Sequence, residues 1–200
     1  MVFPFIKRYR KMGLFKLIAQ ALGFSRRESK ILVIGLDNSG KTTLINHLKP
    51  KKATTTEVVP TVGFQVEQFV KNNIGFTIFD MSGQGRYRSL WEHYYRDVQA
   101  IIYVLDSTDR LRACVAKEEL LQLLNHEDIK NCRIPLLFFA NKMDIPGAMA
   151  PDVCAEELEL DRIRDKPWHI ISSNSVTGYG VDEGIEWLCV RLTSSASGRK

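Results

Sequence analysis

The feature that most constrains this chain is a glycine-rich segment between an apolar run and a helical one. Residues Gly35-Leu36-Asp37-Asn38-Ser39-Gly40-Lys41-Thr42 fit the pattern G-x-x-x-x-G-K-[ST] at every fixed position. In such a loop, successive backbone N–H groups and a helix N-terminus point at a phosphate chain. The spacing predicts that Lys41 reaches the terminal phosphates, that the Thr42 hydroxyl binds Mg²⁺ and that Thr43 completes the nucleotide contacts. A chance glycine-rich turn is the weaker interpretation, because strand, loop and helix occur in the required order.

Apolar runs alternate with helical periodicity along the chain. The continuous apolar runs, typical of strands buried on both faces, are Ile31–Leu36, Phe76–Asp80, Ala100–Asp106, Pro135–Ala140 and Trp168–Ser172. The helical segments are Lys41–Leu48, Leu111–His126, Asp152–Leu158 and Val181–Leu192. Phe64–Val70 forms a predicted hairpin with the run at Phe76, with Lys71–Gly75 as the turn. The pattern predicts an α/β fold with a mostly parallel six-stranded sheet, one antiparallel edge strand and helices on both faces.

Charge separates a basic arm from a nearly neutral domain. The chain of 200 residues carries a net charge of +5, but residues 1–30 hold eight lysine and arginine residues and one glutamate, so the remainder is slightly negative. We predict a basic amphipathic arm with an N-terminal helix at 1–29, a nucleotide-binding domain at 30–192 and a polar basic tail at 193–200. This distribution argues against nucleic acid as a partner. The four cysteines have no metal-ligand spacing and are predicted to be inert thiols in a reducing compartment.

The segment Asn141-Lys142-Met143-Asp144 follows a predicted buried strand and indicates which base is bound. The Asp144 carboxylate can accept hydrogen bonds from the N1–H and the 2-amino group of guanine, whereas adenine has no such donor pair. A buried acceptor pair rejects the base that lacks the donors. Asn141 is expected to brace the loop, and the aliphatic stem of Lys142 to cover the base. GTP or GDP is therefore the predicted nucleotide, and an adenine-nucleotide enzyme is the disfavoured alternative.

Two further segments supply candidate groups for hydrolysis. In Asp80-Met81-Ser82-Gly83-Gln84, Asp80 is placed to hold Mg²⁺ through water, the Gly83 amide to contact a γ-phosphate, and Gln84 to orient an attacking water as the catalytic residue. Thr61, within Pro60-Thr61-Val62-Gly63, is a second hydroxyl ligand for the metal. The alternative for Thr61 is an ordinary turn residue.

Together these segments resemble the Arf family of small GTPases over about residues 13–192. The likeness extends to Asp80–Arg88, Leu90–Tyr95, Leu124–His126 and Lys166–Ile170. It implies a GTP/GDP switch, in which bound GTP holds Thr61 and Gly83 and hydrolysis releases both loops. In this family the hairpin also slides along the sheet and drives the N-terminal helix onto membrane. The implied partners of this monomer are an exchange factor, a GTPase-activating protein and an effector, a ciliary coat complex.

The resemblance also assigns residues where this chain departs from the family. Ser175, in Asn174-Ser175-Val176, replaces the usual alanine, and its backbone N–H is expected to meet the guanine O6. Phe64, Phe79 and Tyr94 match an aromatic cluster that effectors read, with ordinary core packing as the alternative. No arginine stands in an obvious position to act on the γ-phosphate, so unaided hydrolysis should be slow and an activator should supply that group. A binding module that loads GTP without hydrolysing it is the alternative function.

The basic arm predicts contact with an anionic membrane surface through residues 1–30. Apolar residues recur at helical spacing at Leu14, Leu17, Ile18, Ala21 and Leu22. An apolar stripe with basic flanks suits an interfacial helix, and a helix docked permanently on the domain is the alternative. No myristoylation is expected, because eleven residues precede Met12-Gly13 and Leu17 stands where the motif requires Ser or Thr. Whether Met1 or Met12 begins the protein stays open. The predicted location is cytoplasmic and reversibly membrane-associated, at a cilium or basal body.

Overall fold

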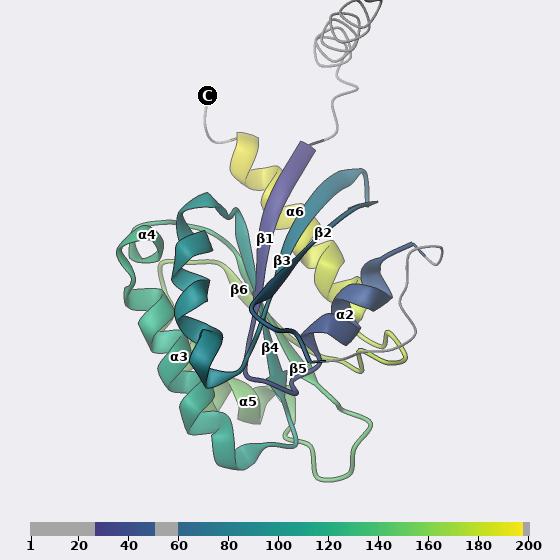
Figure 1. Cartoon of the computed structure of the whole chain (residues 1–200), viewed down its shortest axis with the longest axis vertical. Helices are drawn as coiled ribbons and strands as arrows, with labels where there is room; N and C mark the ends of the chain where they lie inside the picture. Colours follow the sequence, from purple (N-terminus) through teal and green to yellow (C-terminus); the bar gives the residue numbers. More distant parts are fainter. Residues whose placement is uncertain (1–26, 51–59, 198–200) are drawn as a thin grey trace, which may run out of the picture.

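One six-stranded sheet forms the centre of the protein, in the strand order β2-β3-β1-β4-β5-β6 (Figure 1). The computed structural model describes residues 27–50 and 60–197. Its strands are β1 (Arg27–Ile34), β2 (Phe64–Lys71), β3 (Ile74–Met81), β4 (Ala100–Asp106), β5 (Leu136–Asn141) and β6 (Trp168–Ser172). Only β2, at the edge, runs antiparallel to its neighbour. The predicted α/β fold is thus confirmed, apart from the N-terminal helix, which lies outside the described residues.

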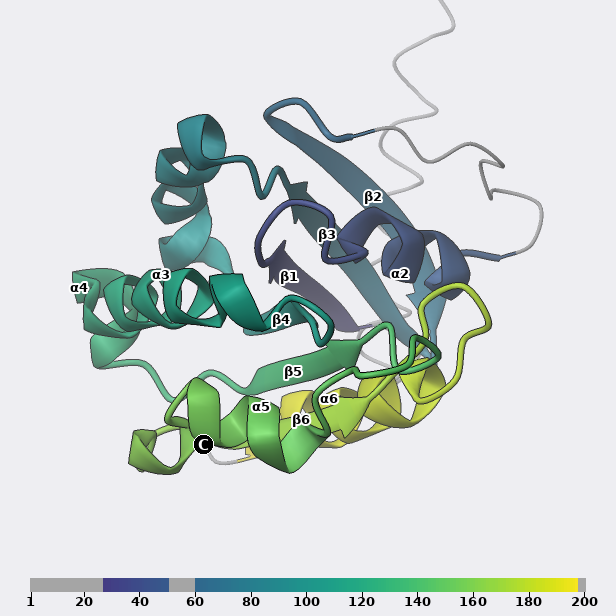
Figure 2. The same ribbon diagram turned by 90° about the horizontal axis from the view of Figure 1, so that it is seen from below.

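Helices cover both faces of this sheet. The α-helices are α2 (Lys41–Leu48), α3 (Ala113–Asn125), α4 (Glu127–Lys130), α5 (Pro151–Glu157) and α6 (Val181–Ser197), and the 3₁₀ helices are η2 (Gly85–Asp97), η3 (Arg110–Arg112) and η4 (Leu160–Arg162). Figure 2 shows α2 and α6 on one face and α3 and α5 on the other. Because the strands before these helices are parallel, each βα loop lies at the same edge of the sheet. Ligands bind at this edge in open α/β folds.

The core has two halves, one on each face of the sheet. Along β1, Leu32 and Ile34 pack with the α3 and α5 side, whereas Ile31 and Val33 pack with α2 and α6. All four side chains are fully buried. Successive residues of a strand point to opposite faces, so a strand with helices on both sides needs apolar residues at every position. This explains the continuous apolar runs of the sequence.

Among the boundaries that differ from the predicted ones, two lie at the ends of the predicted nucleotide-binding domain. β1 begins at Arg27, which pairs with Ile74, so the last residues of the range predicted as arm belong to the sheet. α6 continues to Ser197, beyond the predicted end at Leu192. At the start of the extra turn, the Thr193 hydroxyl donates to the Cys189 carbonyl at 3.0 Å, a hydrogen bond within the helix. The rest of the arm and residues 198–200 lie outside the described residues.

The sequence did not reveal η2, α4 and η4, and it overestimated one turn. In η2, Trp91 is buried and its indole N–H donates to the Ser82 carbonyl at 3.0 Å, which fixes this helix against the end of β3. The β2–β3 turn consists of Asn72 and Asn73 alone, with φ of 49° and 61°. Asparagine tolerates this left-handed region better than most residues, so two residues suffice for the hairpin where five were predicted.

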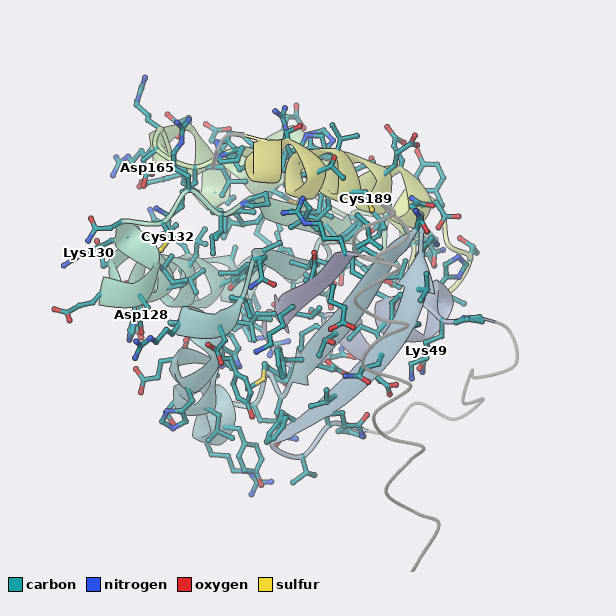
Figure 3. The ribbon with its side chains drawn as sticks, turned by 90° about the horizontal axis from the view of Figure 1, so that it is seen from above. Lys49, Asp128, Lys130, Cys132, Asp165 and Cys189 are labelled. Carbon is teal, nitrogen blue, oxygen red and sulfur yellow. The ribbon has the colours of Figure 1, made fainter. Side chains whose placement is uncertain are left out.

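The four cysteines are free thiols, as expected. Cys154 and Cys189 are buried, whereas Cys114 and Cys132 are exposed. Figure 3 shows Cys132 near α4 and Cys189 on α6, in different parts of the molecule. Burial raises the pKa of both Cys154 and Cys189, which favours their protonated, unreactive form. Among the described helices, none has the length and apolar character to cross a membrane.

The close packing of α6 on the sheet yields a prediction. A Cβ on Gly184 would lie 2.7 Å from two ring carbons of Phe139, whose side chain is fully buried. We expect Gly184→Ala to lower the free energy of unfolding by about 1–3 kcal/mol through overpacking, measured by urea denaturation. A Cβ on Gly85 meets no described atom within 4 Å, so Gly85→Ala is the matched control. Equal stability of the two variants would contradict the assigned contact.

Candidate nucleotide-binding site

The phosphate loop joins β1 to α2 and lines a cavity of about 270 Å³. Gly35 and Gly40 have φ of 138° and 95°, which glycine adopts without strain. A Cβ on Gly40 would overlap the Asn141 side chain, so glycine is also required there for close approach. The cavity is lined by Asp37, Asn38, Gly40, Lys41, Thr42, Thr43, Pro60, Thr61, Met81, Ser82, Gly83 and Gln84. The loop and both predicted switch segments thus face one space.

Lys41 is buried within this loop. Its ammonium donates to the carbonyls of Gly35 at 3.0 Å and Leu36 at 2.7 Å. Burial, partly offset by the nearby carboxylates of Asp80 and Asp37, lowers the pKa of Lys41 to about 8. A phosphate oxygen near this amine would favour its charged form, because an opposite charge counteracts desolvation.

Oxygen atoms from three segments meet at the start of α2. The Thr42 hydroxyl donates to Asp80 Oδ2 at 2.7 Å and lies 3.0 Å from the Thr61 hydroxyl. The other carboxylate oxygen, Asp80 Oδ1, is buried without a hydrogen-bond partner. Burial raises the pKa of Asp80, although the hydrogen bond from Thr42 lowers it in part.

This set of hard oxygen donors fits Mg²⁺, which accepts one or two carboxylates together with hydroxyls, waters and substrate phosphates. The buried Asp80 Oδ1 is an acceptor without a hydrogen-bond partner. No group of three His, Cys, Asp or Glu side chains suited to a metal occurs in the described part of the chain. Thr42 and Thr61 stand as candidate direct ligands because their hydroxyls meet beside Asp80, which would act through water.

The segment after β3 packs against the phosphate loop. A Cβ on Gly83 would overlap the backbone of Leu36 and Asp37, so this glycine is required for close approach. The Ser82 N–H donates to the Gly63 carbonyl at 2.9 Å and thereby joins the two switch segments. Gln84 lines the cavity, but its side-chain oxygen accepts from Arg86 Nε at 3.2 Å.

Two arginines that the sequence analysis did not assign contact the phosphate loop. Arg88 of η2 donates to the Gly83 carbonyl at 2.8 Å and to Glu119 of α3 at 2.8 Å. Arg112 donates to Asp37 Oδ1 at 3.1 Å, and Arg88 lies 3.8 Å from the same oxygen. Both guanidinium groups are thus engaged by carboxylates. Their spacing along the chain carries no motif that would have identified them.

The predicted base-binding residues lie at the ends of β5 and β6. Asn141 Nδ2 donates to the Ser39 carbonyl at 2.8 Å, so it braces the phosphate loop from 102 residues away. Ser175, which is buried, donates its backbone N–H to Asn141 Oδ1 at 3.0 Å, so this N–H already has a partner. Asp144 is exposed in the loop that follows β5. A bound guanine would itself have to shield that carboxylate.

Lys142 has a left-handed backbone, with φ of 65°, and forms an ion pair with Asp106 at 2.6 Å. Burial acts to raise the pKa of Asp106, but hydrogen bonds from Lys142 and Thr108 outweigh it and hold the pKa below its usual value. The ion pair orients the Lys142 stem at the mouth of the predicted base site. Sequence reasoning missed Asp106, although it is the last residue of the buried strand β4.

The three predicted effector residues form one cluster. The ring centroids of Phe64 and Tyr94 lie 5.2 Å apart, and those of Phe79 and Tyr94 lie 4.7 Å apart. Phe64 is 43% exposed, whereas Phe79 and Tyr94 are partly buried against the core. The cluster therefore combines an accessible ring with two that have a packing role.

The chain is similar to known proteins over most of its length. The profile of the ADP-ribosylation factor family matches residues 15–192. ADP-ribosylation factor-like protein 6 of Danio rerio is 58% identical over 177 residues, which are 88% of this chain and 95% of that protein. The protein of the same name from Caenorhabditis elegans is 41% identical over 189 residues, or 94% of this chain and 100% of that one.

A solved structure is also similar. The Arl6 BBS3 small GTPase from Trypanosoma brucei, with the bound nucleotide analogue GppNp, has a TM-score of 0.79 and 44% sequence identity to this chain. The match covers 84% of this chain and 98% of that structure.

The buried Lys41 yields a prediction about proton uptake. At pH 8.5, above its pKa of about 8, most Lys41 side chains are neutral in the nucleotide-free chain. Binding of a nucleoside diphosphate raises that pKa, so we expect more protons to be taken up on binding at this pH than at pH 6.5, where Lys41 is already charged. Calorimetry in buffers of different ionisation enthalpy measures this number. Equal uptake at the two pH values would contradict the assigned role of Lys41.

Proposed function

From the premise that this chain belongs to the ADP-ribosylation factor family, as the match over residues 15–192 establishes, we propose that it is a membrane-recruitment switch. The family makes it an Arf-like small GTPase that binds guanine nucleotide. The proposal adds that GTP-loaded protein binds an anionic membrane, recruits an effector, and hydrolyses GTP slowly until an activating protein assists. The observation that carries it is the contact between the Thr42 and Thr61 hydroxyls, at 3.0 Å. Through it, a switch segment is joined to the phosphate loop.

In the proposed hydrolysis, the chain mainly positions and neutralises charge. Thr42 and Thr61 would hold Mg²⁺ directly and Asp80 would hold it through water; the ion would neutralise charge on the phosphate oxygens. Lys41 contributes a buried positive charge at the terminal phosphates. Gln84 orients the attacking water after leaving its contact with Arg86. Because Arg88 and Arg112 are engaged by carboxylates, an activating protein supplies the arginine.

The alternative is a binding module that loads GTP without hydrolysing it. One observation favours this alternative: the side-chain oxygen of Gln84 accepts from Arg86 Nε at 3.2 Å, so one of its two lone pairs is already engaged. The two functions differ in whether that hydrogen bond opens when GTP is bound.

Kinetics distinguish the two functions. We expect Gln84→Leu to reduce activator-stimulated single-turnover hydrolysis of GTP by about 100-fold or more, since a positioned side chain contributes on that scale. Arg86→Ala is the matched variant, because it removes the competing donor and leaves Gln84 in place; its rate should equal or exceed that of the unmodified chain. Undiminished hydrolysis in Gln84→Leu would remove Gln84 from the mechanism. Absence of hydrolysis in all three proteins would favour the binding module.

The membrane and the effector complete the proposal. Residues 1–26 carry the basic and apolar pattern of an interfacial helix, and each basic residue near an anionic surface contributes about 1 kcal/mol. Phe64, Phe79 and Tyr94 form the effector surface, with the exposed Phe64 ring as its accessible part. The proposed effector is a ciliary coat complex, which places the protein in the cytoplasm with reversible association at a cilium or basal body. This assignment is supported by the resemblance alone.

Vesicle flotation tests the control of membrane binding by nucleotide. The full chain should float with vesicles containing an anionic lipid when loaded with a GTP analogue, and should remain largely unbound when loaded with GDP. Raised salt should weaken the binding, because exposed charges are screened. A chain that begins at Arg27 is the control without the arm. Equal flotation with both nucleotides would show that the arm is not controlled by the switch.

A further inference from the structure

Three donors converge on one buried oxygen at the base site. Asn141 Oδ1 accepts from the Ser173 hydroxyl at 3.2 Å, from the Ser175 backbone N–H at 3.0 Å and from the Ser175 hydroxyl at 2.9 Å. A carboxamide oxygen has two lone pairs. The oxygen therefore has one donor more than it needs, and two of the three come from the same residue.

The surrounding loop holds these groups in place. Asn174 Oδ1 accepts from the N–H groups of Val176 at 2.9 Å and Thr177 at 3.2 Å, so the backbone that follows Ser175 is held by Asn174, whereas the Ser175 N–H is not one of these donors. Asn141 and Ser175 are both buried, at 2% and 4% exposure. At its other end the Asn141 amide donates to the phosphate loop. A change in the hydrogen bonds of Oδ1 therefore affects the contact of Asn141 with the phosphate loop.

We infer that the Ser175 hydroxyl is a positioning group that releases the Ser175 backbone N–H for guanine. The inference rests on the proposed guanine-nucleotide site. When the guanine O6 approaches, the N–H turns from Asn141 Oδ1 to O6, and the hydroxyl keeps Oδ1 paired. Affinity for the base thereby gains a hydrogen bond without leaving a buried acceptor half satisfied.

The remaining donor cannot do this alone. The Ser173 hydroxyl has one proton and lies within reach of two acceptors, Asn141 Oδ1 at 3.2 Å and the Ala140 carbonyl at 3.5 Å. Without the Ser175 hydroxyl, withdrawal of the N–H would leave Oδ1 dependent on that shared proton. Alanine at position 175 therefore makes the backbone N–H choose between Asn141 and the base.

The test compares nucleotides with and without O6. Competition against a ribose-labelled fluorescent GDP gives the Kd of the full chain for GDP and for the diphosphate of 2-aminopurine riboside, which lacks O6. We expect Ser175→Ala to raise the Kd for GDP about three- to tenfold, the usual scale of one hydrogen bond, and to leave the other Kd within about twofold. Ser175→Cys replaces the hydroxyl with a weak donor. Like Ser175→Ala, it should raise the Kd for GDP and leave the other Kd nearly unchanged.

The control is a serine of the same burial outside the site. Ser29 in β1 is 1% exposed and its hydroxyl has no hydrogen-bond partner, so Ser29→Ala should leave both Kd values unchanged. An unchanged Kd for GDP in both Ser175 variants, or an equal rise for the two nucleotides, would overturn the inference. Failure of the unmodified chain to prefer GDP over ADP would instead overturn the guanine site itself, so the two failures are distinguishable.

Discussion

The site depends on parallel strands that end at one edge of the sheet. β1, β3, β4 and β5 lie side by side with the same direction, so the residues that follow them meet although they are distant in sequence. The ends of these strands supply the phosphate loop, Asp80, Asp106 and Asn141. The hydrogen bond from Asn141 to Ser39 then joins the base side to the phosphate side. These contacts depend on the parallel order of the strands, because local structure alone does not bring the residues together.

Burial of charged groups prepares this edge for an anionic ligand. Desolvation lowers the pKa of Lys41 and raises that of Asp80, so both groups are held in surroundings that disfavour their charged forms. A phosphate chain and a divalent cation each supply the opposite charge that these groups lack. Because the cavity already orients both side chains, binding need not organise them, and less free energy is lost in ordering the site.

The parts of the site that follow local rules could be predicted from the sequence, and those that depend on distant partners could not. The phosphate loop and the sheet were predictable because glycine positions and apolar runs have local causes. The ion pairs of Arg88 with Glu119 and of Arg112 with Asp37 join segments that are far apart in the sequence, so no spacing pattern indicates them. For Ser175, reasoning from the backbone alone omitted the hydroxyl, whose role depends on Asn141.

The two switch segments are coupled through the backbone itself. The Ser82 N–H bonds the Gly63 carbonyl, and the next pair along the hairpin is Phe64 with Met81. The exposed Phe64 ring therefore lies one residue from the contact that joins the segments, while Thr61 lies two residues before it on the same chain. A change at the terminal phosphate that moves Thr61 or Gly83 must alter this short connection. In the proposed switch, this short connection links Thr61 and Gly83 to the aromatic cluster without a longer pathway through the core.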